Sequence, residues 1–295
     1  MREREPGRIY ERMKWLIRFL LIFIILALAP AGCAWLGDSG LDTEQGETTI
    51  APLSDKVRVS DHQLKMDAGP LLDYRTFIPI STGAPSRAKH QAEVAGKQPW
   101  VILAHGFLRD QRHMQGLAVA LAEAGFPVAT LNSRHDSPIS GGHVANSQDM
   151  MELARALGAK RVIYAGFSAG ALAALLAARN DPSATGVLTL DLVDSQDLGR
   201  RAAEGLAVPL IALTGMPSNC NANNNAAPVY RVASALSLTP IPQASHCDFE
   251  SPSDRLCRLV CKQPPNQTDD QSEPNAVQGQ VIQTALTGIR QLAGS

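Results

Sequence analysis

The feature that most constrains this chain is a regular alternation of short apolar runs with segments of helical periodicity, which extends from Trp100 to Leu292. The runs typical of buried strands are "WVILA", "FPVATLN", "RVIYAG", "GVLTLDLV", "VPLIALTG" and "LSLTPIP", and "KVRVS" and "YRTFIPI" precede them. Strands that alternate with helices predict an α/β fold, with a mostly parallel central sheet covered by helices on both faces. The connection between "GVLTLDLV" and "VPLIALTG" is too short for a large lid domain.

The N-terminal part of the chain has a different composition. Six basic residues among the first 18 precede the apolar run "FLLIFIILALA", which leads into "PAGC". A basic flank, a short apolar run and small residues are typical of a secretory signal. The ending resembles the lipobox of bacterial lipoproteins, which implies lipid attachment at Cys33. The uncharged stretch from Phe19 to Leu36 is also barely long enough for an uncleaved membrane anchor.

These alternatives agree that the rest of the chain is exported. We therefore predict a signal, lipoprotein or anchor segment at 1–33, a polar linker at 34–49 and one domain at 50–295. The expected location is the bacterial cell envelope, on the periplasmic or outer-surface side, with the membrane contacted through the N-terminal segment. Lys plus Arg (27) nearly balance Asp plus Glu (28), so no basic field predicts nucleic acid as a partner.

Cysteine usage also favours export. Apart from Cys33, the cysteines are Cys220, Cys247, Cys257 and Cys261, an even number in the C-terminal third. In an oxidising compartment they predict two disulfides. Cys257 and Cys261 lie four residues apart on an expected helix, which favours pairing of each with Cys220 or Cys247, and the connectivity stays open. A zinc site is the competing interpretation, but it lacks a CxxC pair.

The pentapeptide Gly166-Phe167-Ser168-Ala169-Gly170 matches the pattern G-x-S-x-G. It follows an apolar strand and opens a helix, which is the setting in which this motif forms a nucleophile elbow. The turn strains the serine backbone, the two glycines leave room for the turn to close, and the hydroxyl projects above the sheet. The competing interpretation is a packing corner at which Ser168 only caps the helix.

A serine hydroxyl is a weak nucleophile until a base takes its proton. Of the seven histidines only His246 follows Ser168, directly after the last expected strand, so it is the predicted base. The usual place for the acid, after "VPLIALTG", holds no carboxylate. The preceding strand offers Asp191, near its carboxyl end, and Asp194; Asp191 is the first choice, and Asp194 stays open as the alternative.

An oxyanion hole needs two backbone N–H donors. Ala169 supplies one, and "HGF" after "WVILA" predicts Phe107 as the other, with Gly106 permitting the bend. His105 is expected to pack under this loop as a structural residue. The asparagine-rich loop Asn219–Pro228 lacks clustered carboxylates, so neither a metal nor a cofactor is expected.

"HGF", "GFSAG", the order of strands and the late histidine together resemble the α/β-hydrolase superfamily, over residues 50–293. Within it, "GVLTLDLVDS" and a cysteine in the loop after the strand are similar to the chlorophyllase and dienelactone-hydrolase-like branch. Chlorophyllases carry the acid on this strand in a motif like "LDPVD", so the resemblance implies Asp191 rather than Asp194. The chain differs from chlorophyllases at Ala169, where they have arginine or another larger residue, and at Leu192, where they have proline.

The residues and the resemblance lead to one expected function and two alternatives. The first is a serine hydrolase that cleaves small or extended carboxylic esters through an acyl-enzyme, with Ser168, His246 and Asp191 as the catalytic residues. One alternative is an envelope-anchored protein of the same fold that binds a partner with little or no turnover, which the missing acid after "VPLIALTG" supports. The other alternative is a hydrolase of amides or of a polymer such as a polyester, which the same fold permits.

Overall fold

The computed structural model describes residues 48–49, 54–67, 69–80, 98–135, 142–261 and 276–294, which all belong to the unit Gly46–Ser295. The predicted signal or anchor segment at 1–33, its lipid attachment at Cys33 and the linker up to residue 47 lie outside the described residues. No helix among the described residues is long and apolar enough to cross a bilayer.

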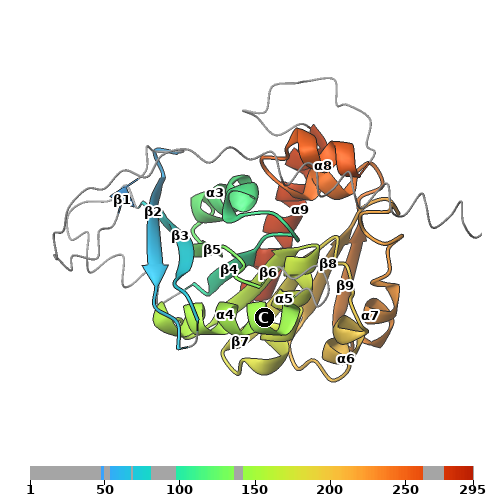
Figure 1. Cartoon of the computed structure of the whole chain (residues 1–295), viewed down its shortest axis with the longest axis horizontal. Coiled ribbons are helices and arrows are strands. Elements are labelled where there is room, and N and C mark those ends of the chain that lie inside the picture. The colour runs from blue at the N-terminus through green and yellow to red at the C-terminus, as the bar shows by residue number, and fades with distance from the viewer. Residues whose placement is uncertain are drawn as a thin grey trace, which may run out of the picture. The chain divides into compact units, whose positions relative to one another are not determined.

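The centre of the unit is a sheet with the strand order β1-β2-β3-β5-β4-β6-β7-β8-β9 (Figure 1). The strands are β1 (Thr48–Thr49), β2 (Val57–Leu64), β3 (Leu72–Pro79), β4 (Trp100–Ala104), β5 (Val128–Leu131), β6 (Val162–Phe167), β7 (Ala184–Leu190), β8 (Leu210–Thr214) and β9 (Leu236–Pro240). The pairings β1–β2, β2–β3 and β3–β5 are antiparallel, and all pairings from β5 through β9 are parallel. The predicted mostly parallel sheet is therefore confirmed.

Helices cover both faces of this sheet (Figure 1). The helical segments are the 3₁₀ turn η1 (Gln111–Met114), α3 (Gln115–Glu123), α4 (His143–Ala156), α5 (Ala169–Asn180), α6 (Leu198–Ala203), α7 (Ala227–Val232), the 3₁₀ turn η2 (His246–Phe249), α8 (Arg255–Val260) and α9 (Ala276–Ala293). Helices α3 and α9 pack on one face, and α4, α5, α6 and α7 pack on the other.

Strand β4 shows why the sheet is buried on both sides. Its side chains alternate, so that Ile102 and Ala104 pack into the cluster under α5 whereas Val101 and Leu103 pack into the cluster under α3 and α9. All five residues of the strand are buried. A continuous apolar run of this kind is what a central parallel strand requires.

The parallel register places the carboxyl ends of the central strands at one edge of the sheet. Ala104, at the end of β4, is opposite Gly166 in β6, and Phe167 is opposite Leu190, at the end of β7. After β4 the chain continues to β5 on one side, whereas β6 lies on the other side, so a topological switch point falls there. Ligands of open α/β sheets bind outside the carboxyl ends of the strands at such a point.

The eight strands expected from the apolar runs are present, although β2 extends four residues beyond "KVRVS" and β7 ends three residues before the end of "GVLTLDLV". Helices alternate with the strands from β4 onward, as expected. The segment between β7 and β8, residues 191–209, contains only α6 and its turns, which confirms that no lid domain is inserted there. Four short elements were not predicted, namely the two-residue strand β1, the helix α7 and the 3₁₀ turns η1 and η2, because each has too few residues for a periodic pattern.

Candidate active site

Ser168 occupies the sharp turn between β6 and α5. Its φ of 54° and ψ of −117° lie outside the regions that side-chain-bearing residues ordinarily adopt. The turn depends on its glycines, because a Cβ at Gly166 would lie 2.3 Å from the carbonyl oxygen of Gly170. A Cβ at Gly170 would in turn lie 2.3 Å from the carbonyl oxygen of His105. The predicted strand–serine–helix turn is therefore present, and it holds the hydroxyl at the carboxyl edge of the sheet.

His246 opens η2 in the loop after β9, and both nitrogens of its ring have side-chain partners. Nε2 lies 3.1 Å from Oγ of Ser168, and Nδ1 lies 2.6 Å from Oδ2 of Asp191. A carboxylate only accepts hydrogen bonds, so Nδ1 carries the ring proton and Nε2 presents its lone pair to the serine hydroxyl. The ring of Phe167 packs against the imidazole at a centroid distance of 4.6 Å and limits its rotation.

Asp191 directly follows β7 and has a φ of 44°. Its carboxylate is buried, with Oδ2 facing His246 and Oδ1 accepting a hydrogen bond of 2.9 Å from the backbone N–H of Gly215. Gly215 is the first residue after β8, the place where the sequence carries no acid. That position therefore contributes a backbone donor to the carboxylate of the neighbouring strand.

The other aspartates near the site have structural partners. Asp194 accepts hydrogen bonds from the backbone N–H groups of Gly199 (2.7 Å) and Arg200 (3.3 Å) in the first turn of α6. Asp248 accepts from the N–H and the hydroxyl of Ser245 at the start of η2. Of the two acids left open by the sequence, Asp191 is the one that the fold brings to His246, and Asp194 caps a helix.

The N–H of Ala169 belongs to the first turn of α5, where a helix has no internal acceptor for it. The second predicted donor, Phe107, follows Gly106, whose Cα lies so close to Ser168 that an added Cβ would be 3.4 Å from Cβ of that serine. The two predicted donors thus belong to segments that flank the serine hydroxyl. Both remain predictions as oxyanion donors.

The buried ring of His105 holds the loop that carries Phe107. Nε2 of His105 accepts a hydrogen bond of 2.9 Å from the N–H of Ser133, so Nδ1 is protonated and donates to the carbonyl oxygen of Gly106 at 2.7 Å. Because a trans peptide points its N–H and C=O in opposite directions, this bond turns the N–H of Phe107 away from His105. Burial lowers the pKa of His105 to about 4. The expectation that His105 is a structural residue is confirmed.

His143 also reaches the site, although nothing in the sequence marked it. It begins α4, is buried and forms a hydrogen bond with the backbone of Ala169, the residue after Ser168. Burial lowers its pKa, and the hydrogen bond to Ala169 and the charge of Asp194 oppose that shift. The contact joins residues 26 positions apart on different elements, so no local pattern could have revealed it.

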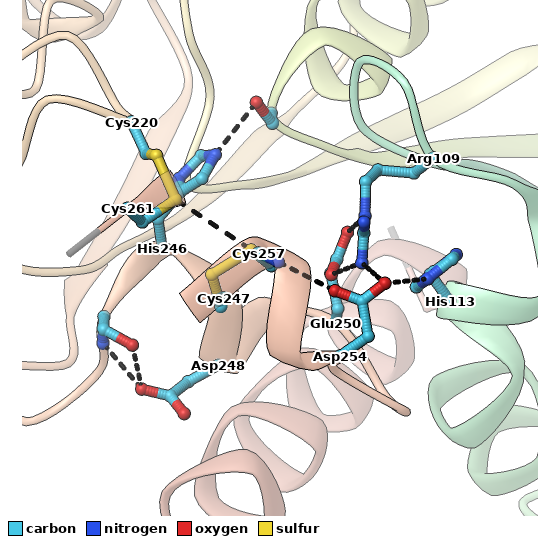
Figure 2. Close-up of a disulfide and its surroundings, with 12 residues drawn as sticks. Arg109, His113, Cys220, His246, Cys247, Asp248, Glu250, Asp254, Cys257 and Cys261 are labelled. Atoms are coloured by element: carbon cyan, nitrogen blue, oxygen red, sulfur yellow. Dashed lines mark hydrogen bonds and ion pairs between the residues drawn. A yellow bond between two sulfur atoms is a disulfide. The ribbon is translucent and has the colours of Figure 1, made fainter. Parts of the chain in front are cut away.

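Two disulfides lie beside the site and join at α8 (Figure 2). Cys247, which follows His246, pairs with Cys257, and Cys220 pairs with Cys261. The prediction that Cys257 and Cys261 each pair outward is confirmed. The sulfur atoms of Cys247, Cys257 and Cys261 lie within 4.8 Å of one another. A metal requires free thiolates, and all three sulfurs are committed to disulfides, so this cluster does not fit a metal.

A buried ion pair connects the Phe107 loop to the His246 loop (Figure 2). The guanidinium of Arg109 donates to both carboxylate oxygens of Glu250, at 2.6 and 2.8 Å, and lies 3.1 Å from Asp254. Nε2 of His113 lies 3.4 Å from the same oxygen of Asp254. Burial raises the pKa of Glu250, and the charge of Arg109 opposes this rise. This network was not predicted.

Comparison with known proteins yields structures but no sequence family. No protein-family model matches the chain, and no curated protein matches it in sequence. Est1E from Butyrivibrio proteoclasticus is similar in structure, with a TM-score of 0.57 and 14% identity over 80% of this chain and 99% of that chain. The fold is that of the α/β-hydrolases.

Two further structures support the same fold. An acetyl xylan esterase from Paenibacillus sp. R4 has a TM-score of 0.54 and 13% identity, and the match covers 68% of this chain and 82% of that chain. A cold-adapted esterase from an Arctic intertidal metagenomic library has a TM-score of 0.53 and 14% identity, and the match covers 69% and 91%. At these identities the likeness concerns the fold, and the chemistry of this α/β-hydrolase-fold protein must be argued from its own residues.

Proposed function

We propose that the protein is a serine hydrolase that cleaves carboxylic esters through an acyl-enzyme, with Ser168 as nucleophile, His246 as base and Asp191 as acid. The observation that carries the proposal is the continuous hydrogen-bond chain from Oγ of Ser168 through the imidazole of His246 to the carboxylate of Asp191. Three side chains from three separate loops meet at the switch point of the sheet. A serine that only capped α5 would not require this arrangement, and its side chain makes no cap hydrogen bond there.

In the first half of the reaction, Oγ of Ser168 attacks the acyl carbon while Nε2 of His246 takes the hydroxyl proton. The C=O π electrons move to the oxygen, which becomes the oxyanion that Ala169 and Phe107 stabilise through their N–H groups. The tetrahedral intermediate then collapses, the C–O bond to the alcohol breaks, and His246 returns the proton to the leaving alcohol. The product on the enzyme is an ester of Ser168.

In the second half, water replaces the alcohol. His246 takes a proton from the water while the water oxygen attacks the acyl carbon. The bond between the acyl carbon and Oγ of Ser168 then breaks as His246 returns that proton to Oγ. The carboxylate of Asp191 holds the ring tautomer and stabilises the imidazolium formed in each half. The acid product and the free serine complete the cycle.

The substrate class follows from the surroundings of the serine. No lid-sized insertion follows β7, which favours a site open to small or extended esters. Esterases are among the proteins of similar structure, which supports ester chemistry over amide chemistry. The similarity of "GVLTLDLVDS" to the chlorophyllase and dienelactone-hydrolase-like branch supports the placement of the acid on β7.

The test uses activated esters and a fluorophosphonate probe on the exported domain. The wild type is expected to hydrolyse p-nitrophenyl acetate and butyrate and to incorporate the probe at Ser168. Ser168→Ala abolishes both, and Ser234→Ala, which changes an exposed serine just before β9, leaves both unchanged. A folded wild type that neither turns over these esters nor takes up the probe would instead support the binding protein without turnover.

The cellular location is part of the proposal. The two disulfides support an oxidising compartment outside the cytoplasm, where such bonds persist. We further propose that Cys33 carries the lipid anchor. Mass spectrometry of the protein from membranes tests this, because a Cys33→Ala variant loses the lipid mass and partitions to the aqueous phase.

A further inference from the structure

The asparagine-rich loop after β8 supplies none of the reacting groups of the proposed hydrolysis. Its sequence, "NCNANNNAAP" from Asn219 to Pro228, would expose most of its amides if it were only a solvated connection. Asn221 is instead completely buried, with 0% of its surface exposed. Burial of an amide without partners costs free energy, so its contacts identify what the loop is built to hold.

Each hydrogen-bonding position of the Asn221 side chain has a partner. Nδ2 donates to Oδ2 of Asp191 at 3.1 Å and to the carbonyl oxygen of Met216 at 2.8 Å. Oδ1 accepts from the backbone N–H groups of Ser218 (2.7 Å) and Asn224 (3.2 Å). An amide has two N–H donors and two oxygen lone pairs, and all four are used here. If the amide were flipped, its oxygen would face Oδ2 of Asp191 and the carbonyl oxygen of Met216, which are both acceptors. The N–H group of Asn221 is therefore fixed toward the carboxylate.

The backbone around Asn221 is itself fixed. Nδ2 of Asn224 donates to the carbonyl oxygen of Gly215, whose N–H holds Oδ1 of Asp191. Nδ2 of Asn225 donates to the carbonyl oxygen of Asp194, and Oδ1 of Asn225 accepts a hydrogen bond from the N–H of Asp194. These two bonds also hold the segment after Asp191 in place. The disulfide of Cys220, the residue before Asn221, ties the loop to α8 (Figure 2).

The carboxylate of Asp191 therefore receives three donors, from Gly215 at Oδ1 and from Asn221 and His246 at Oδ2. Two of these belong to the loop after β8 and are present whether or not the imidazole is protonated. They define the plane and the rotamer of the carboxylate, and thereby the direction along which Nδ1 of His246 must donate. Rigid support of this kind is what keeps a reacting group in its productive geometry.

We propose that Asn221 is a positioning residue for the reaction, which holds the carboxylate of Asp191 so that His246 is aligned on Ser168. The loop after β8, the usual source of the acid, here supplies the amide that orients an acid donated by β7. This inference rests on the proposed hydrolase function, because Asn221 acts only through Asp191.

The first experiment compares Asn221→Asp with Asn223→Asp. Both change the same residue type to the same carboxylate in the same loop, but Asn223 is exposed whereas Asn221 is buried against Asp191. Asn221→Asp replaces a donor by a second carboxylate, and two carboxylates at this distance repel. The kcat for p-nitrophenyl butyrate is measured per active site, with the active sites counted by titration with the fluorophosphonate. We expect Asn221→Asp to lower this kcat about 100-fold and to leave KM nearly unchanged. Asn223→Asp should match the wild type.

The second experiment uses a variant without a buried charge, so that folding is not at risk from electrostatics. Asn221→Ala is expected to lower kcat about 10-fold when Asp191 is present, because the carboxylate of Asp191 then loses one charge-assisted hydrogen bond. In an Asp191→Ala background the same change should have no further effect on kcat, because Asn221 then has no carboxylate to hold. A residue that only stabilised the fold would lower kcat by the same factor in both backgrounds.

The outcomes separate the two proposals. If the wild type neither hydrolyses the ester nor takes up the phosphonate, the hydrolase function is wrong. If the wild type is active and Asn221→Ala matches Asn223→Asp in kcat, or loses the same factor with and without Asp191, the positioning role is wrong and the hydrolase function stands. Non-additive losses confined to kcat support both.

Discussion

Two of the buried histidines near Ser168 have partners that give them different roles. His105 has backbone groups on both nitrogens, which fixes a neutral ring as part of the Gly106–Phe107 loop. His246 has a carboxylate on one nitrogen and a hydroxyl on the other, which allows a proton to arrive and leave. The surroundings, rather than the residue type, separate a structural imidazole from a candidate base.

The lowered pKa of His105 predicts a pH dependence of stability. Below its ordinary pKa of 6.5 the unfolded chain binds a proton at this residue, whereas the folded state stays neutral down to about pH 4. The unfolded state binds more protons in this window, so the free energy of unfolding falls as the pH drops from 6.5 to 4. Burial is the main cause of the lowered pKa; the hydrogen bond to the carbonyl oxygen of Gly106 and the charge of Asp110 oppose it, and the charges of His113 and Arg109 add to it.

The expected loss from His105 is about 3 kcal/mol at the acid end of this window. Urea unfolding at pH 7 and pH 4.5 measures it. In a His105→Asn variant, which is less stable at pH 7, the difference between the two pH values should shrink by about that amount. An unchanged difference in the variant would show that other groups cause the acid sensitivity.

At the scale of elements, the ion pair of Arg109 and Glu250 joins two segments that are 141 residues apart in sequence. Arg109 lies in the connection from β4 to η1, and Glu250 directly follows η2. The side chain of Glu250 has no exposed surface, so its charge depends on Arg109 for compensation. The pair therefore fixes the Phe107 loop relative to the His246 loop.

Arg109→Met is expected to destabilise the protein by about 3–5 kcal/mol, because it leaves the buried carboxylate without its partner. Arg112→Met is the matched control, since Arg112 pairs with Asp110 while 72% of its side chain is exposed, and a change within about 0.5 kcal/mol is expected. Urea unfolding compares the two variants.

The loss of stability caused by Arg109→Met should depend on pH. Removal of Arg109 raises the pKa of Glu250 further, so the folded state binds more protons than the unfolded state above the ordinary pKa. The folded state then loses stability as the pH rises, and the loss caused by Arg109→Met should be larger at pH 8 than at pH 5. An equal loss at both values would contradict the electrostatic account.

At the scale of the whole molecule, local patterns predicted the architecture well and the long-range contacts poorly. The buried strands, such as β4 and β6, are continuous apolar runs, because a central strand of a parallel sheet is covered on both faces. The strand–serine–helix turn is encoded within five residues. The position of His246 followed from its being the only histidine after Ser168, and its catalytic role is still a proposal.

Other features depend on which residues the fold brings together, and sequence spacing carries no record of that. The outward pairing of Cys257 and Cys261 followed from their helical spacing, but their individual partners did not, because Cys220 and Cys247 were equally available to either. The amide of Asn221 on Asp191, the ring of His143 on Ala169 and the bridge from Arg109 to Glu250 all join separate elements. Each needs the tertiary structure to be seen.

The disulfides contribute to the stability of the whole domain. They close segments with sequence separations of 41 and 10 residues. Loop-closure entropy predicts losses of about 4 kcal/mol for Cys220→Ala/Cys261→Ala and about 3 kcal/mol for Cys247→Ala/Cys257→Ala. Urea unfolding measures both, and the phosphonate probe should label Ser168 more slowly in each. Full labelling rates in both variants would show that the covalent links do not support the site.

The two disulfides at α8 make the candidate site depend on the redox state of its surroundings. Under reducing conditions neither disulfide forms, so Cys247, which follows His246, and Cys220, which precedes Asn221, are not covalently tied down. Oxidation of the four thiols completes this scaffold. For the exported hydrolase proposed above, we therefore expect the reduced chain to be a latent precursor that gains its activity on oxidation.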